Sequence, residues 1–204
     1  RDGQAVPVPE PTDMPDPGRG RSANRSSFGK IMNDMARADT DFVSRLVTTA
    51  TDVPGSTHLG GFVNRNGLFS RSAGADVFRK RNSASRQIWA HSPKGQHIEL
   101  GIAENNLFLM LGALGLSKDL FDQRVFPVGT VYDPFIARGL DALNYACYQD
   151  ARFILVATPS GLTLGPEGGA HQSVSSPLIG MGQPGLTYWE PAFSDEVRVI
   201  LREA

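Results

Sequence analysis

The stretch GQHIELGIAENNLFLMLGALGLS, residues 95–117, decides most of the fold prediction. Residues 107–116 contain no charged side chain, and this apolar run predicts a buried helix over about residues 102–116. Glu104 lies at the beginning of that helix. A carboxylate that leads into a buried segment needs a partner or a chemical role.

Short apolar strands and amphipathic helices alternate on both sides of this helix. Strands are expected in residues 41–53, 124–131, 151–159 (a buried strand) and 186–191, and further helices in residues 27–38, 135–150 and 194–204. Residues 56–94 are rich in Gly, Asn, Ser and Arg and predict an irregular excursion with short elements. The alternation predicts an α/β domain with a mostly parallel sheet flanked by helices.

The composition excludes several classes of protein. The 204 residues are 40% hydrophobic and 20% charged, as in an ordinary globular protein. The net charge of -1 gives no reason to expect nucleic acid or an anionic membrane as a partner. A single cysteine, Cys147, excludes an internal disulfide and favours a cytoplasmic setting. The longest apolar run is shorter than the roughly 20 residues of a membrane helix.

Residues 1–26 differ in composition from the rest of the chain. Five prolines and the polar run GRGRSANRS predict a linker or a disordered arm, because too little apolar surface is present to offset the entropy of ordering. Residues 27–204 are then one folded domain, with Ser27 as the N-cap of its first helix. The chain begins with Arg1 rather than methionine, so we expect it to be part of a longer protein.

Two interpretations of Glu104 follow from the residues alone. A glutamate in the first turn of a helix is common, because the helix macrodipole stabilises its charge. A buried carboxyl can instead share a proton with a ligand nitrogen. Periodicity by itself favours the first interpretation.

Ligands bind at the carboxyl ends of parallel strands, so the loops after residues 131, 158 and 190 are candidate sites. Residues 158–173, TPSGLTLGPEGGAHQS, are rich in glycine, which favours a binding loop over a structural one. His171 is either a proton donor or acceptor or a histidine hydrogen-bonded into this loop. Tyr132 and Phe135 either pack in the core or offer their faces to a flat heterocycle.

A G-x-G-x-x-G pattern at residues 180–185 does not predict a dinucleotide site. It precedes an expected strand instead of joining a strand to a helix, and Pro184 interrupts it. The four histidines are too scattered along the sequence to indicate a metal site.

Taken together and in this order, the motifs resemble the pyrimidine-binding domain of the thiamine-diphosphate enzymes of the transketolase and 2-oxoacid dehydrogenase superfamily. The matching segments are GIAE at 101–104, GTVY at 129–132, the loop from Thr158 through Gly165 and Gly168 to His171 and Gln172, and DVPGS at 52–56. The phrases GLFSRS, KGQHIELGI, YQDARF and YWEPAFSDEVRVI are most similar to the homodimeric type of pyruvate dehydrogenase. Pro159 stands where transketolases usually carry a histidine near the sugar, which puts ketol transfer in doubt.

The resemblance implies roles for individual residues. Glu104 would hydrogen-bond a ring nitrogen of the cofactor's aminopyrimidine and favour its imino tautomer, which requires a dry, protonated carboxyl. Tyr132 and Phe135 would stack on the pyrimidine, and His171 would handle protons on the reacting intermediate or the acyl acceptor. Further implied residues are Gly129 and Thr130 at the cofactor, and Asp52, Ser56, Glu167 and Gln172 in the substrate loops.

The resemblance also implies what lies outside this chain. The family binds Mg²⁺ and the diphosphate with a G-D-G followed by an Asn, and the 204 residues contain no G-D-G. Mg²⁺ would therefore be bound by another domain, with no metal ligand in this chain. The implied partners are a second copy in a homodimer, a diphosphate-binding domain of the same family and a lipoyl-bearing acyltransferase.

The implied function is oxidative decarboxylation of a pyruvate-type 2-oxoacid, with transfer of the acyl group to an acceptor. This chain would be the middle domain of the enzyme and inactive alone. The alternatives are transketolase-like ketol transfer, or a degenerate domain that serves in assembly or regulation.

Overall fold

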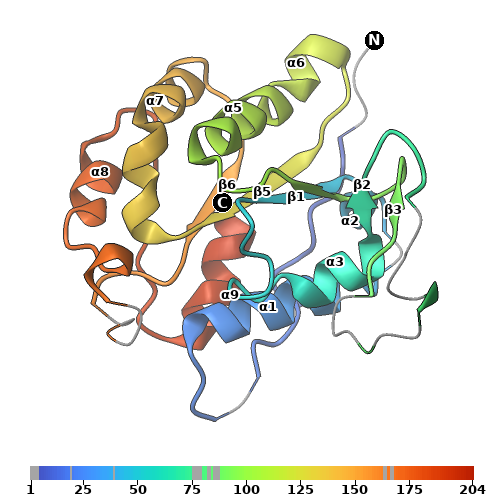
Figure 1. Ribbon diagram of the computed structural model, residues 1–204, viewed down its shortest axis with the longest axis horizontal. Helices are drawn as coiled ribbons and strands as arrows, with labels where there is room; N and C mark the ends of the chain where they lie inside the picture. The colour runs from blue at the N-terminus through green and yellow to red at the C-terminus, as the bar shows by residue number, and fades with distance from the viewer. Residues whose placement is uncertain are drawn as a thin grey trace.

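A six-stranded sheet forms the centre of the computed structural model, which describes residues 5–18, 20–38, 40–74, 80–81, 84, 88–162, 165 and 168–204. The strands are β1 (Leu46–Ala50), β2 (Leu68–Phe69), β3 (His91–Ser92), β4 (His97–Glu99), β5 (Phe126–Val131) and β6 (Ile154–Ala157). Their order is β3-β2-β4-β1-β5-β6, and every pair is parallel (Figure 1). The predicted α/β fold with a mostly parallel sheet is confirmed.

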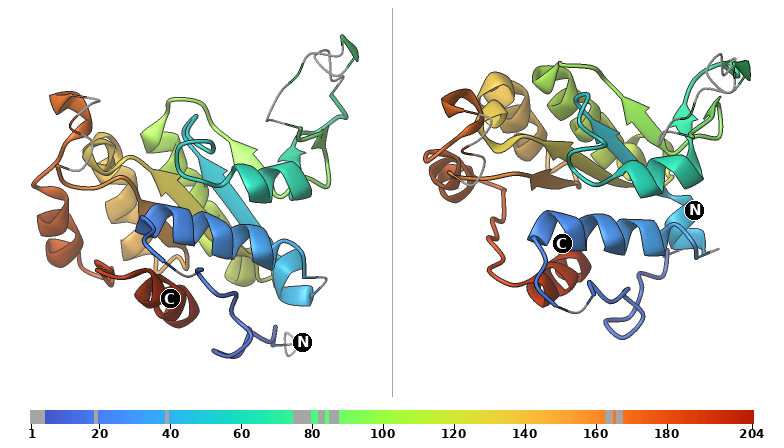
Figure 2. Two further views of the ribbon diagram at one scale, coloured as in Figure 1. Left: turned by 90° about the horizontal axis from the view of Figure 1, so that it is seen from below. Right: turned by 60° about the horizontal axis from the view of Figure 1, so that its bottom comes forward.

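Helices cover both faces of the sheet, and an apolar cluster fills each interface (Figure 2). One layer contains α1 (Asn24–Met35), α3 (Gly60–Asn66) and α9 (Ser194–Glu203). The other contains α5 (Glu104–Gly115) and α7 (Leu140–Tyr148), with α6 (Ser117–Phe121) following α5. The remaining elements are α2 (Asp41–Ser44), α8 (Ser176–Gly182) and the 3₁₀ turns η1 (Asp133–Gly139) and η3 (Gly169–His171). Every helix in the described part of the chain is too short or too polar to cross a membrane.

The helix predicted over residues 102–116 is α5, which packs directly on β5 but is buried on one side only, because Leu109 is 55% exposed. Leu107, Phe108 and Leu111 are completely buried there. Gly129 in β5 permits this close packing, because a Cβ at that position would lie 2.6 Å from Leu111 Cδ1. The helix that carries Glu104 is therefore fixed to the central part of the sheet.

Several local expectations are wrong. Residues 41–44 form the short helix α2 ahead of β1, because the Thr40 hydroxyl accepts a hydrogen bond from the Val43 N–H and caps the first turn. Residues 186–191 form no ladder with the described strands, so their aromatic content does not produce a strand. β6 is an edge strand and only partly buried. The first helix begins at Asn24, three residues before Ser27, which is buried.

Part of the proline-rich N-terminal stretch lies against the helical layer of α1 and α9. Met14 is 4% exposed and belongs to the apolar cluster on that face. The Pro11 carbonyl accepts a 2.6 Å hydrogen bond from Arg198 in α9, and the Asp16 carbonyl accepts one from Lys30 in α1. These contacts place residues 11–16 beside the domain formed by the later residues.

Candidate functional site

Glu104 is the first residue of α5, and its side chain is only 6% exposed. Its partner is Arg138 in η1, whose Nη1 donates a hydrogen bond to Glu104 Oε1 at 3.0 Å. The Arg138 guanidinium also lies over the Phe135 ring, with 3.9 Å between Cζ and the ring centroid. The buried carboxylate thus has a cationic partner that is itself half exposed.

Three rings gather beside this ion pair. Tyr132 follows β5, Phe135 lies in η1 and His171 ends η3. The Phe135 and His171 centroids are 5.4 Å apart, those of Tyr132 and His171 5.7 Å, and those of Tyr132 and Phe135 6.0 Å. All three side chains are half-buried. The structure therefore brings together Glu104, Tyr132, Phe135 and His171, which lie far apart in the sequence.

Asp133, which the sequence reasoning missed, connects the loops that carry these rings. It is 3% exposed, and its Oδ2 accepts a hydrogen bond from the Gly161 N–H in the loop after β6. Its carbonyl accepts another from the Ser176 hydroxyl at the start of α8. The Thr158 N–H donates to the Val131 carbonyl, and the Thr158–Pro159 peptide bond is cis. The strand ends after β5 and β6 are thus joined.

Gly129 and Thr130 lie within β5, just before Tyr132. Gly129 faces Leu111 of α5, and the Thr130 hydroxyl is 3.3 Å from the Thr57 hydroxyl. Both are part of the packed support of the strand end. Gln172 follows His171 and is half-buried, whereas Glu167 lies outside the described residues.

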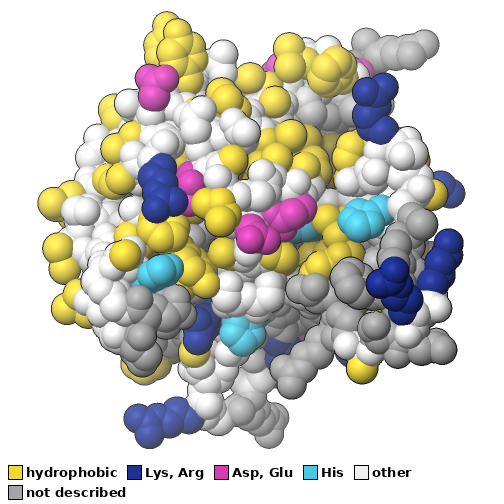
Figure 3. Space-filling view, viewed as in Figure 1, with side chains coloured by type: hydrophobic (Ala, Val, Ile, Leu, Met, Phe, Trp, Pro, Cys, Tyr) yellow, Lys and Arg dark blue, Asp and Glu magenta, His cyan; other side chains and the backbone are white. Residues whose placement is uncertain are grey.

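Asp52 and Ser56 belong to a second area, where a hollow of about 400 Å³ lies over the carboxyl ends of β1 and β4. Both residues line this hollow and are exposed, and Asp52 has a left-handed backbone with φ of 62°. His97 and Glu99 of β4 line it as well. Figure 3 shows that acidic side chains lie near the middle of this face of the molecule, with histidines around them.

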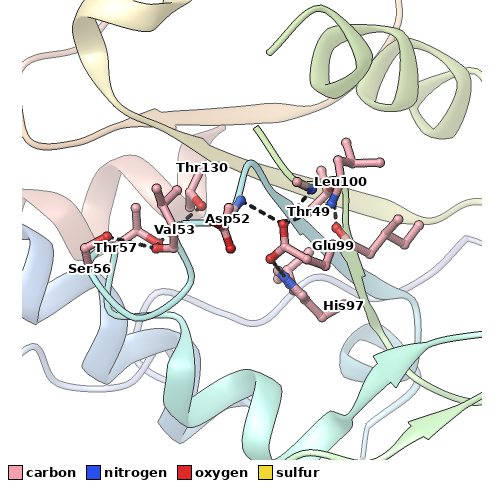
Figure 4. A network of polar contacts seen from close by, with 12 residues as sticks. Thr49, Asp52, Val53, Ser56, Thr57, His97, Glu99, Leu100 and Thr130 are labelled. Carbon is pink, nitrogen blue, oxygen red and sulfur yellow. Dashed lines mark hydrogen bonds and ion pairs between the residues drawn. The ribbon is translucent and has the colours of Figure 1, made fainter. Parts of the chain in front are cut away.

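Glu99 and His97 form a polar network at the hollow that the sequence reasoning also missed (Figure 4). Glu99 Oε1 accepts hydrogen bonds from the backbone N–H groups of Asp52, Leu100 and Gly101. Burial alone raises the pKa of Glu99, but the nearby His97 ring and the hydrogen bonds from the Asp52 and Gly101 N–H groups outweigh it and hold this pKa below its ordinary value. Glu99 is therefore an anion at neutral pH.

The described residues contain no group of three or more His, Cys, Asp or Glu side chains that could hold a metal ion.

Comparison with known proteins places the chain in a superfamily, although no family model matches it. The chain is 25% identical over 180 residues to the pyruvate dehydrogenase E1 component of Pseudomonas aeruginosa. That alignment covers 87% of this chain and 20% of that protein. It is 30% identical over 140 residues to the E1 component of Mycolicibacterium smegmatis, covering 68% of this chain and 14% of that protein. The dihydroxyacetone synthase of Candida boidinii is 24% identical over 132 residues, 64% of this chain and 18% of that protein. The chain thus spans a fifth or less of the length of these relatives.

Two solved structures show the same fold. The transketolase from Leishmania mexicana superposes with a TM-score of 0.73 at 19% identity, over 98% of this chain and 26% of that one. The transketolase from Campylobacter jejuni superposes with a TM-score of 0.70 at 16% identity, over 95% of this chain and 26% of that one. The sequence relatives and the shared fold lead to one conclusion: the chain belongs to the transketolase-like superfamily of thiamine-diphosphate-dependent enzymes.

Proposed function

We propose that this chain provides the pyrimidine-binding part of the active site of a thiamine-diphosphate-dependent, pyruvate-type 2-oxoacid dehydrogenase. The observation that carries the proposal is the convergence of a buried carboxyl, Glu104, with the half-buried rings of Tyr132, Phe135 and His171. The similarity to pyruvate dehydrogenase E1 components supports the substrate class.

These residues fit an aminopyrimidine. A flat heterocycle with ring nitrogens needs one hydrogen-bonding group held out of water and apolar faces on which to stack. Glu104 supplies this hydrogen-bonding group: its Oε1 accepts a hydrogen bond from Arg138, and its second carboxyl oxygen can hydrogen-bond to a ring nitrogen. Phe135 and Tyr132 supply ring faces at the end of β5.

Each residue then has one task. Glu104 binds the ring nitrogen and holds the pyrimidine in one orientation and tautomer. Tyr132 and Phe135 fix its plane and exclude water. His171, which contacts both rings, donates or accepts protons on the substrate side. When bound, thiamine diphosphate supplies the electron sink for decarboxylation of the keto acid.

The proposal includes partners, because the diphosphate and Mg²⁺ need a site that no described cluster of this chain supplies. We assign that site to a diphosphate-binding domain of the same family, on a second copy in a homodimer. Residues 27–204 are then the middle domain of a longer cytoplasmic enzyme that passes the acyl group to a lipoyl-bearing acyltransferase. Ile102, which is 75% exposed two residues before Glu104, offers an apolar contact for such a partner domain.

A transketolase-like ketol transfer is the second candidate, favoured by the transketolase fold and by the similarity to dihydroxyacetone synthase. The experiment that separates the two is an assay of the full-length protein with pyruvate and an artificial electron acceptor, in parallel with ketose phosphates. We expect turnover of pyruvate. Turnover of ketose phosphates alone would eliminate the dehydrogenase. No turnover with either substrate would favour a domain that serves in assembly or regulation.

A further inference from the structure

Glu99, the last residue of β4, binds the backbone of two separate loops. Its Oε1 accepts the Asp52 N–H at 2.7 Å, in the turn after β1. The same oxygen accepts the Leu100 and Gly101 N–H groups, each at 3.0 Å, in the loop that joins β4 to α5. One carboxylate thus ties the beginning of the loop that leads to Glu104 to the neighbouring strand end.

The loop of residues 100–103 has few other anchors. The Leu100 N–H is shared with the Ala50 carbonyl at 3.1 Å, and the Ala103 N–H donates to the Gly101 carbonyl at 2.8 Å. Ala103 is the N-cap of α5 and has no side chain that can cap the helix. Gly101 adopts a φ of 65°, a conformation that is strained for other residues. The bonds to Glu99 are therefore a main restraint on the backbone immediately before Glu104.

His97 orients the other oxygen of Glu99. Its ring is completely buried, and its Nδ1 lies 2.8 Å from the Thr48 hydroxyl, which is also buried. Its Nε2 lies 3.5 Å from Glu99 Oε2, within ion-pair distance, and has no hydrogen-bond partner among the described residues. A Thr48 hydroxyl that donates to Nδ1 leaves the ring proton on Nε2, the nitrogen on the side of the carboxylate. The other titratable groups at this hollow are Asp52 and His91.

We propose that His97 and Glu99 are positioning residues for Glu104: they hold the loop of residues 100–103, and through it the start of α5, in the geometry that lets Glu104 meet its ligand. The inference rests on the proposed role of Glu104. It adds that the hollow beside Asp52 and the ring site around Glu104 are mechanically coupled through a pair made of the buried His97 ring and the partly exposed Glu99 carboxylate.

Two measurements on the full-length protein test this coupling. The first is hydrogen exchange of the Asp52, Leu100 and Gly101 amides. The second is the rate at which the thiazolium C2 proton of bound thiamine diphosphate exchanges with deuterium, which reports the action of Glu104 on the cofactor. In Glu99→Ala we expect the three amides to exchange at least tenfold faster and the C2 proton at least tenfold slower.

The variants separate positioning from general destabilisation. Glu99→Gln keeps a side-chain oxygen that can accept hydrogen bonds from backbone N–H groups. The C2 proton should therefore exchange faster in Glu99→Gln than in Glu99→Ala. If Glu99→Ala does not fold, Glu99→Gln is measured in its place. His97→Asn should slow C2 exchange less than Glu99→Ala. Glu196→Gln is the matched control, because Glu196 also accepts two backbone N–H groups, those of Ala192 and Phe193 at the start of α9. It should leave C2 exchange unchanged.

The outcomes distinguish this inference from the proposed function. A Glu104→Gln variant with an unchanged C2 exchange rate contradicts the proposed function, and the amide exchange still reports whether Glu99 restrains the loop. If Glu104→Gln slows C2 exchange but Glu99→Ala leaves it within twofold of the wild type, the positioning pair is refuted. Slower C2 exchange without faster amide exchange also refutes it, since the effect would not pass through the loop.

Discussion

Gly139, at the end of η1, is where the ring-bearing turn packs most closely on α5. A Cβ at this position would lie 2.3 Å from Phe108 Cδ2 and 3.0 Å from the Glu104 carbonyl oxygen. Phe108 is completely buried, and the close packing of protein cores leaves little room for its ring to move. The Gly139 φ of -132° suits any residue, so the cost of Gly139→Ala is steric rather than conformational.

We expect Gly139→Ala to destabilise the domain by about 1–3 kcal/mol, the usual cost of overpacking a well-filled core. For a domain of this size this corresponds to a fall in Tm of roughly 2–12 °C. The clash also pushes η1 away from α5, so Arg138 and Phe135 should move away from Glu104. Cofactor affinity in the full-length protein should therefore fall together with stability.

Chemical and thermal unfolding, followed by circular dichroism, give the change in unfolding free energy. Gly60→Ala is the matched control, because a Cβ there has no neighbour within 4 Å. It should be neutral or slightly stabilising, since alanine is the better helix former. If the unfolding free energy of Gly139→Ala lies within about 0.5 kcal/mol of the wild-type value, the described packing of η1 on α5 is wrong.

Three further predictions concern charge and ligand binding. Arg138→Ala should lower the free energy of unfolding by about 1–2 kcal/mol, because it leaves the buried Glu104 carboxylate without its partner. Arg152→Ala, which removes an exposed ion pair, should lower it by less than about 0.5 kcal/mol. Equal effects of the two substitutions in urea unfolding would contradict the difference in burial. The folded-state pKa of Glu99 is depressed, so Glu99 stabilises the fold above its ordinary pKa of 4.5, and this stabilisation is lost as the pH falls through the lower folded-state pKa. Glu99→Gln should therefore weaken the fall of the unfolding free energy at acidic pH. If the wild type and Glu99→Gln give the same curve of unfolding free energy against pH from pH 3 to 7, the network around Glu99 is wrong. The 204-residue chain alone should bind thiamine diphosphate weakly or not at all, because the proposed diphosphate site lies elsewhere; titration calorimetry that gives micromolar or tighter binding would overturn this assignment.

The parts of the fold that depend on local pattern are predictable from the sequence. The uncharged apolar run predicts a buried helix at residues 102–116, and α5 confirms the helix. Its burial is confirmed on one side only, since Leu109 and Ala113 are exposed. Residues 186–191 show the limit of this approach, since aromatic and β-prone residues form a strand only where a neighbouring strand is free to pair. The start of α2 carries a readable signal, the Thr40 N-cap, that the apolar run after it obscured.

The candidate site likewise contains residues that the sequence predicts to lie together and contacts that it does not predict. Tyr132, Phe135 and His171 are expected together because strand ends of a parallel sheet meet at one edge, whereas Glu104 is expected with them only through the family resemblance. The contacts of Glu104 with Arg138, of His97 with Glu99, and of Glu99 with the Asp52 N–H were not expected. The contact between Glu99 and Asp52 depends on β4 lying next to β1, and that order differs from the order along the chain.

The measurement that tests the account most directly is C2-proton exchange of thiamine diphosphate bound to the full-length protein, compared between the wild type and Glu104→Gln. Replacing the carboxyl by an amide keeps the shape of the side chain but removes the carboxyl group that would bind the ring nitrogen. We predict that exchange slows by about 10²–10⁴-fold in a folded variant that still binds the cofactor. An exchange rate within twofold of the wild type would show that Glu104 is a helix-start charge paired with Arg138 and has no role in the chemistry.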